Sequence, residues 1–176
     1  DVESRGLGDV YKRQPVILMR KRLVLYGNLN WNIRNIKDFY RRMVFNVVSR
    51  NHNDHTKNHV FLMDKTGKWA LGPAYDLCYS YMPGGQWANS HQMSLNGKRD
   101  DFTYDDLITV GKRVVIVTPS ETIEKVVDVV SHWKGYARDC GVREAHLDLI
   151  NKNLRLLTKH SVLGYEGNLK KKFVRS

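Results

Sequence analysis

The sequence predicts an α+β domain that is mostly helical and carries one small β-hairpin. Apolar residues recur at steps of three and four in two long stretches, as in amphipathic helices. Between these stretches, two short β-prone runs flank a turn at residues 65–68, which is typical of a hairpin. The chain has 176 residues, 41% of them hydrophobic, which is enough for one domain with an apolar core.

Composition excludes several classes of protein. A disordered chain would have too few apolar residues to offset the entropy of ordering. The longest apolar runs, residues 15–19 and 114–117, are far shorter than the ~18 residues of a membrane-spanning helix. Two cysteines form no disulfide framework and no secretory signal is visible, so we expect a cytoplasmic protein without membrane contact. The formal net charge of +11 favours acidic partners such as nucleic acid or nucleotide phosphates.

The chain divides into three segments. Residues 4–14 resemble translated sequencing-adapter sequence, so we treat residues 1–14 as non-native and expect the natural protein to extend further at its N-terminus. Residues 15–160 form the predicted domain. Residues 161–176 contain several lysines and are interpreted as a solvated basic tail.

The predicted elements follow from local patterns. Residues 16–26 are apolar and basic and fit a short helix or strand. A helix is expected over residues 36–48 with Asn35 as its N-cap, because one apolar stripe runs along it. The stripe consists of Ile36, Phe39, Tyr40, Met43, Val44, Val47 and Val48.

A polar loop at residues 51–58 follows this helix, and then come the hairpin strands, residues 59–64 and 69–71. Residues 91–95 are expected to form another strand, closed by a turn at Asn96 and Gly97.

Two helices are predicted in the C-terminal third. Thr118, Pro119 and Glu121 form the pattern of a capping box with proline at the first helical position. The apolar stripe that follows runs from Ile123 to Cys140 and ends at Gly141. A second stripe indicates the last helix, and its members are Leu147, Ile150, Leu154 and Leu157.

The polar loop contains side chains suited to phosphoryl transfer. Amide and carboxylate oxygens occur at Asn53, Asp54 and Asn58, Lys57 suits a phosphate, and Asp76 follows the hairpin. Oxygen ligands of this kind suit Mg²⁺, which keeps several waters and also binds phosphate oxygens. A kinase site uses residues in this order: an acid, then an asparagine five residues later, and then an aspartate beyond a hairpin.

The same residues resemble a known family. The segment 50–58 (RNHNDHTKN), with Asp64, Trp69, residues 73–76 (PAYD) and residues 91–99 (HQMSLNGKR), is similar to the HipA toxin kinase family over roughly residues 36–157. The resemblance implies a protein-kinase-like C-lobe whose hairpin carries the catalytic and metal loops. It also implies ATP, Mg²⁺ and phosphorylation of Ser/Thr in protein targets, aminoacyl-tRNA synthetases among them. The implied partner is a DNA-binding antitoxin, through which the protein would contact DNA indirectly.

The resemblance assigns roles and exposes one departure. Asn58 and Asp76 match the family's metal ligands, and His55 and Lys57 match residues close to the phosphates. The family's catalytic base is an aspartate five residues before the metal asparagine, where this chain has Asn53. Asp54 matches the second aspartate of the motif and is the alternative base. The candidate catalytic residues are therefore Asn53, Asp54, His55 and Lys57.

An amide accepts a hydrogen bond but takes no proton near neutral pH, and a general base supplies about 10²–10⁴-fold in rate. Phosphorylation is therefore expected to be strongly reduced even in the complete protein, while Mg²⁺–nucleotide binding can persist. The family's ATP-contacting lobe is not recognisable in this chain, so we expect the chain alone to bind ATP poorly and to have no kinase activity.

Two alternatives remain open from the sequence. The chain could instead be a non-catalytic basic module that binds nucleic acid or an antitoxin–operator complex; such a module would not require Asn58 and Asp76 to converge. His52, His55 and His59 would share one face of a helix and could ligate zinc if this segment were helical. The residues alone suggest no role for segment 91–99.

Overall fold

A computed structural model describes residues 33–159 of the chain. Three sequence predictions lie outside these residues: the adapter-like segment 1–14, the element at residues 16–26 and the basic tail at residues 161–176. The described part is mostly helical with one two-stranded antiparallel sheet, which confirms the α+β prediction.

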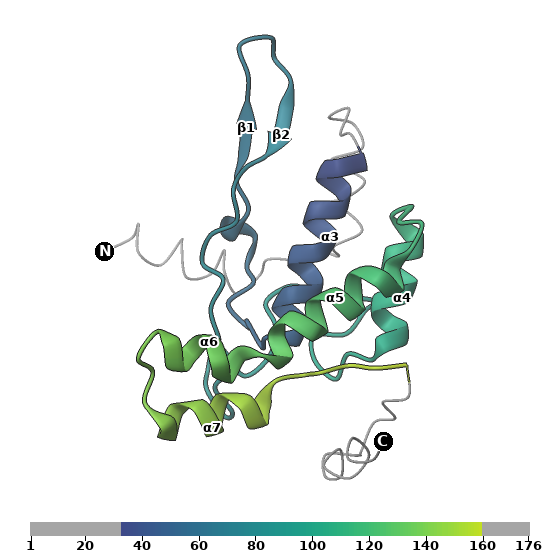
Figure 1. The fold of residues 1–176 in the computed structure, drawn as a ribbon. Helices are drawn as coiled ribbons and strands as arrows, with labels where there is room; N and C mark the ends of the chain where they lie inside the picture. The colour runs from purple at the N-terminus through teal and green to yellow at the C-terminus, as the bar shows by residue number, and fades with distance from the viewer. Residues whose placement is uncertain (1–32, 160–176) are drawn as a thin grey trace, which may run out of the picture.

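In chain order the elements are α3 (Ile33–Val48), η1 (Thr56–Asn58), β1 (Phe61–Met63), β2 (Trp69–Leu71), α4 (Tyr104–Arg113), α5 (Pro119–Ser131), α6 (Trp133–Asp139) and α7 (Glu144–Asn153). In Figure 1, α5 crosses α3 near the middle of the molecule, α4 lies beside them, and the hairpin of β1 and β2 projects away from the helices.

The apolar stripe of α3 forms the centre of the core. Phe39, Val44 and Val48 have no exposed surface, and they pack in one cluster with Leu107 of α4 and Ile123 of α5. The predicted helix is therefore confirmed, including its end at Val48.

The start of α3 differs from the prediction. The helix begins at Ile33, so Asn35 lies inside it and is buried, and the N-cap assigned to Asn35 is wrong.

Helix α4 was not predicted from the sequence. It is stabilised at its start by a capping box, in which Thr103 accepts a hydrogen bond from the Asp106 amide while the Asp106 carboxylate accepts one from the Thr103 amide. The capping box predicted at Thr118 does not form, although Pro119 does occupy the first turn of α5.

The long C-terminal stripe also divides into two helices. One helix was expected from Ile123 to Cys140, but α5 ends at Ser131, and α6 begins at Trp133. The last helix, α7, stops at Asn153, and the chain beyond it is extended rather than helical. There the Arg155 amide donates to the Val48 carbonyl at 2.9 Å, so this segment runs against the end of α3.

The hairpin follows the prediction closely. Strands β1 and β2 pair with Phe61 opposite Leu71 and Met63 opposite Trp69. Arg42 of α3 donates from Nη2 to the Gly72 carbonyl at 2.6 Å, which ties the base of the hairpin to α3.

Segment 91–99 is a folded loop rather than the predicted strand. Only a single bridge pairs Leu95 with Lys98. The turn between them does form as predicted: Asn96 and Gly97 both have positive φ, 50° and 82°, as a type I′ turn requires.

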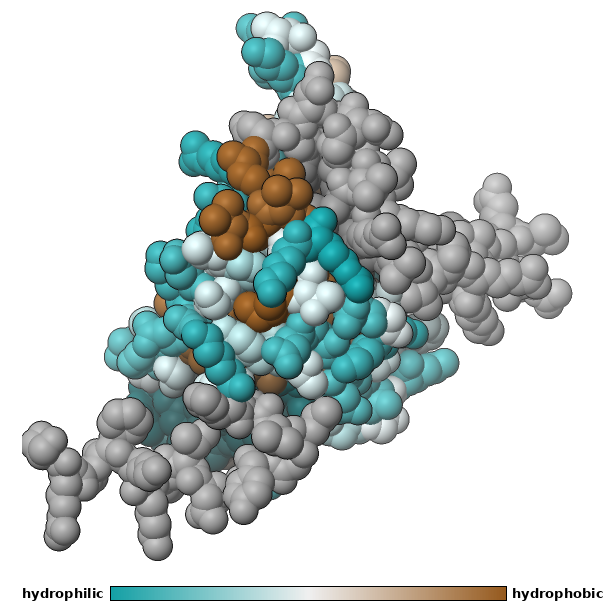
Figure 2. Space-filling model, turned by 90° about the vertical axis from the view of Figure 1, so that its right-hand side faces the viewer, coloured by the Kyte–Doolittle hydropathy of each residue, from teal (hydrophilic) through white to brown (hydrophobic). Residues whose placement is uncertain are grey.

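Figure 2 views the side that carries α4, where a patch of apolar surface interrupts a mainly hydrophilic face. In the connection from α4 to α5, Val115 and Val117 are 73% and 85% exposed. No helix within residues 33–159 combines the length and apolar character needed to cross a membrane.

Candidate functional site

The polar loop leaves α3 through a sharp change of backbone direction. Arg50 has φ of 57°, and residues 51–55 that follow it belong to no helix or strand. Asn51 is 1% exposed and fixes the start of this loop, because its Nδ2 donates to Asn46 Oδ1 and to the Asp76 carbonyl, each at 3.0 Å. Ser80 Oγ donates to Asn51 Oδ1 at 3.1 Å and accepts from the Asn53 amide at 2.9 Å. These contacts hold the loop against the chain around Asp76.

Asp76 lies at the centre of the candidate site. Its Oδ2 accepts hydrogen bonds from Asn58 Nδ2 at 2.5 Å and from Asn53 Nδ2 at 3.1 Å. Its backbone has φ of 53°, a left-handed conformation that aspartate tolerates better than most residues but that still needs support from its surroundings. The structure therefore brings together the two residues predicted as metal ligands and the residue at the base position.

The side chain of Asn58 is oriented by two hydrogen bonds that its Nδ2 donates. Its Nδ2 donates to the Asn53 carbonyl at 2.9 Å as well as to Asp76. The side-chain oxygen of Asn58 is then the atom that remains to act as a ligand. Tyr75 donates from its hydroxyl to the Lys57 carbonyl, which joins the short η1 turn to the segment that carries Asp76.

These residues fit a magnesium ion. A carboxylate from Asp76 and an amide oxygen from Asn58 are hard oxygen donors, the class that Mg²⁺ prefers. Two protein ligands leave room for water and phosphate oxygens, which Mg²⁺ normally retains. Within residues 33–159 no three His, Cys, Asp or Glu side chains gather as a metal cluster, so the donor set suits a phosphate-bound ion better than a closed protein cage.

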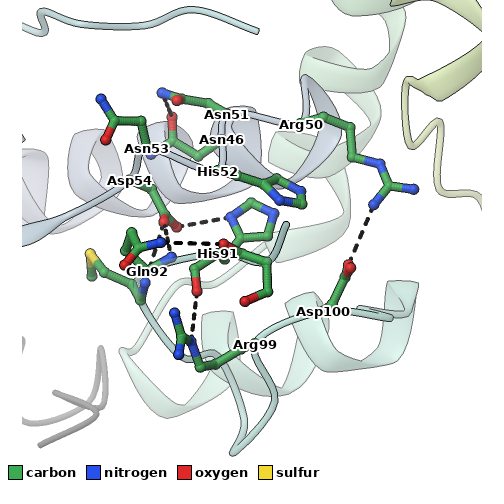
Figure 3. Close-up of polar contacts among 12 residues, drawn as sticks. Asn46, Arg50, Asn51, His52, Asn53, Asp54, His91, Gln92, Arg99 and Asp100 are labelled. Atoms are coloured by element: carbon green, nitrogen blue, oxygen red, sulfur yellow. Dashed lines mark hydrogen bonds and ion pairs between the residues drawn. The ribbon is translucent and has the colours of Figure 1, made fainter. Parts of the chain in front are cut away.

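Figure 3 shows the Asp54 side chain directed toward His91 and Gln92, on the side opposite to Asn53. Its carboxylate is buried: Oδ1 accepts from the amides of Gln92 at 2.7 Å and Met93 at 3.2 Å, and Oδ2 contacts His91 Nδ1 at 3.0 Å. The sequence places Asp54 among the candidate catalytic residues. Its position corrects that assignment, because its oxygens are directed into the protein and hold the 91–93 segment.

The other two predicted residues lie at the start of η1. His55 is the N-cap of this turn, is half-buried and makes no side-chain cap hydrogen bond. Its Nδ1 is buried without a partner among the described residues. Lys57 is exposed in the same turn, one residue before Asn58. Both side chains therefore belong to the turn that carries one candidate metal ligand.

The zinc alternative is contradicted by the positions of the histidines. His52 is fully buried, and its ring lies 4.2 Å from that of His91 between ring centroids. His59 packs on Phe39 instead, at 4.8 Å between centroids. His52 lies in no helix, so the three histidines do not share a helix face.

His52 belongs to a column of rings in tilted contact under the loop. The column runs through Tyr81, His52, His91 and Phe102, with neighbouring centroids 4.8, 4.2 and 5.1 Å apart. Burial, and then the proximity of His91, lowers the pKa of His52 to about 4. His52 is therefore neutral near pH 7, and its Nδ1 donates to the Ala88 carbonyl at 3.1 Å.

Two arginines close the ends of the column. Arg50 lies 4.6 Å over the Tyr81 ring and Arg155 lies 5.5 Å over the Phe102 ring. Both arginines contact Asp100, Arg50 at 3.4 Å. Burial would raise the pKa of Asp100, but the hydrogen bond and charge of Arg155, together with the charge of Arg50, keep it below its ordinary value.

Sequence reasoning missed the residues that support the site. Ser80 and His91 are far from the loop in sequence, and no spacing rule connects them to it. Segment 91–99 was singled out without a role. In the structure its first part holds Asp54, and its second part holds Asp106, which accepts from Lys98 Nζ at 2.7 Å and from Asn96 Nδ2 at 2.8 Å.

Comparisons with known proteins point to one family. A search of curated proteins found no match, and a search of solved structures found none either. Among known protein families, the HipA-like C-terminal domain matches residues 19–157, a span that contains the loop, the hairpin, Asp76 and segment 91–99. This chain therefore belongs to the family of HipA-like C-terminal domains.

Proposed function

We propose that this chain is the catalytic C-terminal part of a HipA-family serine/threonine kinase in which the general base is replaced by an amide. The observation that carries the proposal is the convergence of Asn58 and Asp76 at 2.5 Å, with Asn53 donating to the same carboxylate. The family membership also supports it, because the matched span contains both residues. The motif resemblance assigns Asn58 and Asp76 to the family's metal ligands.

In this proposal the chain's residues bind and orient the phosphates. Asp76 and Asn58 would hold Mg²⁺, which when bound offsets the negative charge of the nucleotide phosphates. Lys57 adds a positive charge beside them, and His55 adds an imidazole. Asn53 can accept a hydrogen bond from the attacking hydroxyl, but its amide takes no proton, so transfer is slow.

The proposed biological setting follows from the family. We infer a toxin–antitoxin system in the cytoplasm, with a DNA-binding antitoxin as partner and contact with DNA through that antitoxin. The substrate would be a protein serine or threonine, with aminoacyl-tRNA synthetases as one class of target. A purely basic module that binds nucleic acid does not need Asn58 and Asp76 to meet, so their convergence favours phosphoryl transfer over that alternative.

The decisive experiment measures divalent-ion binding by the purified chain. Mn²⁺, a paramagnetic substitute for Mg²⁺, is titrated and its free fraction is followed by electron paramagnetic resonance. We expect the wild type to bind one ion and Asp76→Asn to weaken binding at least tenfold, because the only carboxylate ligand is lost. Asp139→Asn, at an exposed aspartate in α6, is the matched control and should bind as the wild type does.

Equal Mn²⁺ affinity in the wild type and in Asp76→Asn would contradict the proposal. Binding to DNA that weakens steeply with salt and ignores nucleotide would favour the basic module. Asn53→Asp tests the base assignment in a chain joined to the nucleotide-binding lobe that the resemblance implies. The expected result is a gain of about 10²–10⁴-fold in autophosphorylation. The absence of a gain would contradict the assignment of position 53 as the base position.

A further inference from the structure

The side chains on either side of position 53 point into the protein. His52 and Asp54 are 0% and 5% exposed, whereas Asn53 between them reaches Asp76 on the opposite side. Residues 51–55 belong to no helix or strand, so the direction of each side chain depends on its own contacts and on those of its neighbours. Figure 3 shows the side chains of Asn53 and Asp54 on opposite sides of the loop. The contacts that hold residues 52 and 54 therefore also constrain the direction of residue 53 between them.

One residue, His91, contacts both His52 and Asp54. The His91 ring contacts the His52 ring at a tilt of 39° with centroids 4.2 Å apart, and its Nδ1 lies 3.0 Å from Asp54 Oδ2. The amides of the next two residues, Gln92 and Met93, donate to the other oxygen of Asp54. An ionised carboxylate only accepts hydrogen bonds, so the contact requires a hydrogen on His91 Nδ1.

His91 is itself held rigidly. Its amide donates to the Arg99 carbonyl at 3.0 Å, and Arg99 Nε donates back to the His91 carbonyl at 2.7 Å. Its ring packs on Phe102, and it is fully buried. A rigid support of this kind is what keeps a site residue within the narrow range of geometry that its chemistry needs.

We propose that His91 is a positioning residue that directs the side chain of residue 53 toward Asp76 by anchoring His52 and Asp54 together. The inference deepens the proposed function and rests on it, because residue 53 matters only if Asp76 and Asn58 form the phosphoryl-transfer site. The inference assigns a role to segment 91–99. This segment comes after the hairpin in the chain, yet it supports the loop that comes before the hairpin.

Two substitutions at His91 separate the ring from the hydrogen bond. His91→Phe keeps an aromatic ring in the stack but removes the donor to Asp54. His91→Asn loses the ring but places an amide nitrogen close to where Nδ1 lies. His146→Phe is the matched control, since His146 is an exposed histidine in α7.

The readouts are the nuclear magnetic resonance signal of the Asn53 side-chain amide and the Mn²⁺ affinity of the chain. We expect His91→Phe to shift the Asn53 amide signal and to weaken Mn²⁺ binding about tenfold, the usual scale for one lost charge-assisted hydrogen bond. His91→Asn should restore Mn²⁺ affinity to within about threefold of the wild type. His146→Phe should change neither readout.

A folded His91→Phe variant with an unchanged Asn53 amide signal would overturn the inference. If the wild type binds no Mn²⁺, the proposed function fails, but the Asn53 signal still decides whether His91 positions residue 53. Asp54→Asn serves if His91→Phe does not fold. Its amide oxygen can accept from Gln92 and Met93 while its nitrogen faces His91, so the His91 proton should move to Nε2 and the Asn53 signal should shift. An unchanged His91 tautomer and an unchanged Asn53 signal would contradict the inference.

Discussion

Asn53 donates a hydrogen bond from Nδ2 to Oδ2 of Asp76 across 3.1 Å. The residue at the base position is thus bonded to one of the candidate metal ligands, and the amide stabilises the carboxylate without a cation. An aspartate at position 53 would put two negative charges at this distance, an arrangement that is unfavourable unless a cation lies between them or one carboxylate is protonated.

The first prediction concerns this pair. Asn53→Asp should lower the free energy of unfolding without Mg²⁺ by on the order of 1 kcal/mol, because a hydrogen bond becomes a repulsion. Adding Mg²⁺ should raise the melting temperature of the variant more than that of the wild type. Differential scanning fluorimetry with and without Mg²⁺ measures both effects. Asn53→Ala is the control, since it removes the hydrogen bond but adds no charge; an equal Mg²⁺ response in all three proteins would contradict the prediction.

The second prediction concerns the backbone of Asp76. Its φ of 53° lies in the left-handed region, which asparagine and aspartate adopt more readily than alanine. Asp76→Asn should therefore be more stable than Asp76→Ala by about 1 kcal/mol, although both lose the carboxylate. Urea unfolding followed by circular dichroism gives the comparison. Equal stabilities of the two variants would show that the backbone conformation carries no cost for alanine.

The third prediction is a dependence of stability on pH. His52 has a pKa lowered from 6.5 to about 4, first by burial and then by His91, with Arg50 and Arg155 adding to the shift and Asp100 opposing it. As the pH falls from 6.5 towards 4, the unfolded chain takes up a proton that the folded chain does not. The free energy of unfolding should then fall by on the order of 2–3 kcal/mol across this window.

His52→Phe keeps a ring in the column and removes the titrating group, so its stability should vary less between pH 7 and pH 4.5. Urea unfolding at several pH values is the measurement. An identical dependence of the unfolding free energy on pH in wild type and His52→Phe would contradict the prediction.

Asp106 affects stability in a different pH range. Burial opposes the shift, but hydrogen bonds from Lys98, Asn96 and Thr103 lower its pKa to about 2, so its contribution is lost only below about pH 4.

The fourth prediction concerns two glycines in helices. A Cβ on Gly111 of α4 would lie 2.6 Å from Pro119 Cβ and 2.9 Å from the Tyr40 hydroxyl oxygen, where α3, α4 and α5 meet. Gly111→Ala should destabilise the protein by about 1–3 kcal/mol through overpacking. Gly135→Ala in α6 has open space around its Cβ and should stabilise by about 0.5–1 kcal/mol through helix propensity. Thermal unfolding of both variants tests the pair, and effects of the same sign would contradict it.

The sequence predicted those elements whose signal is local. The stripe of α3 and the hairpin were expected and are present, and the turn at Asn96 and Gly97 forms because both residues accept positive φ. The break between α5 and α6 was missed because the apolar stripe continues across it. Helix α4 was missed although Thr103 and Asp106 provide its capping box, since Leu107 and Val110 offer only a short apolar pattern.

The candidate site divides in the same way. The spacing and the resemblance were enough to propose that Asn58 and Asp76 meet, and they do. The true environment of Asp54 depends on His91, which lies 37 residues away, and on the amides that follow it. Backbone donors carry no side-chain signature, so no pattern in the sequence indicates that this carboxylate is buried.

The projecting hairpin has a practical consequence for work with the isolated protein. In the described part of the chain the sheet has two strands only, so each of β1 and β2 presents one edge with no strand beside it. Leu62, Met63 and Trp69 are 54%, 59% and 40% exposed there. Open strand edges with apolar side chains are templates for intermolecular pairing. Concentrated samples will therefore tend to aggregate by this route, and a lysine in place of Leu62 is the first solubilising change to make before crystallisation or spectroscopy.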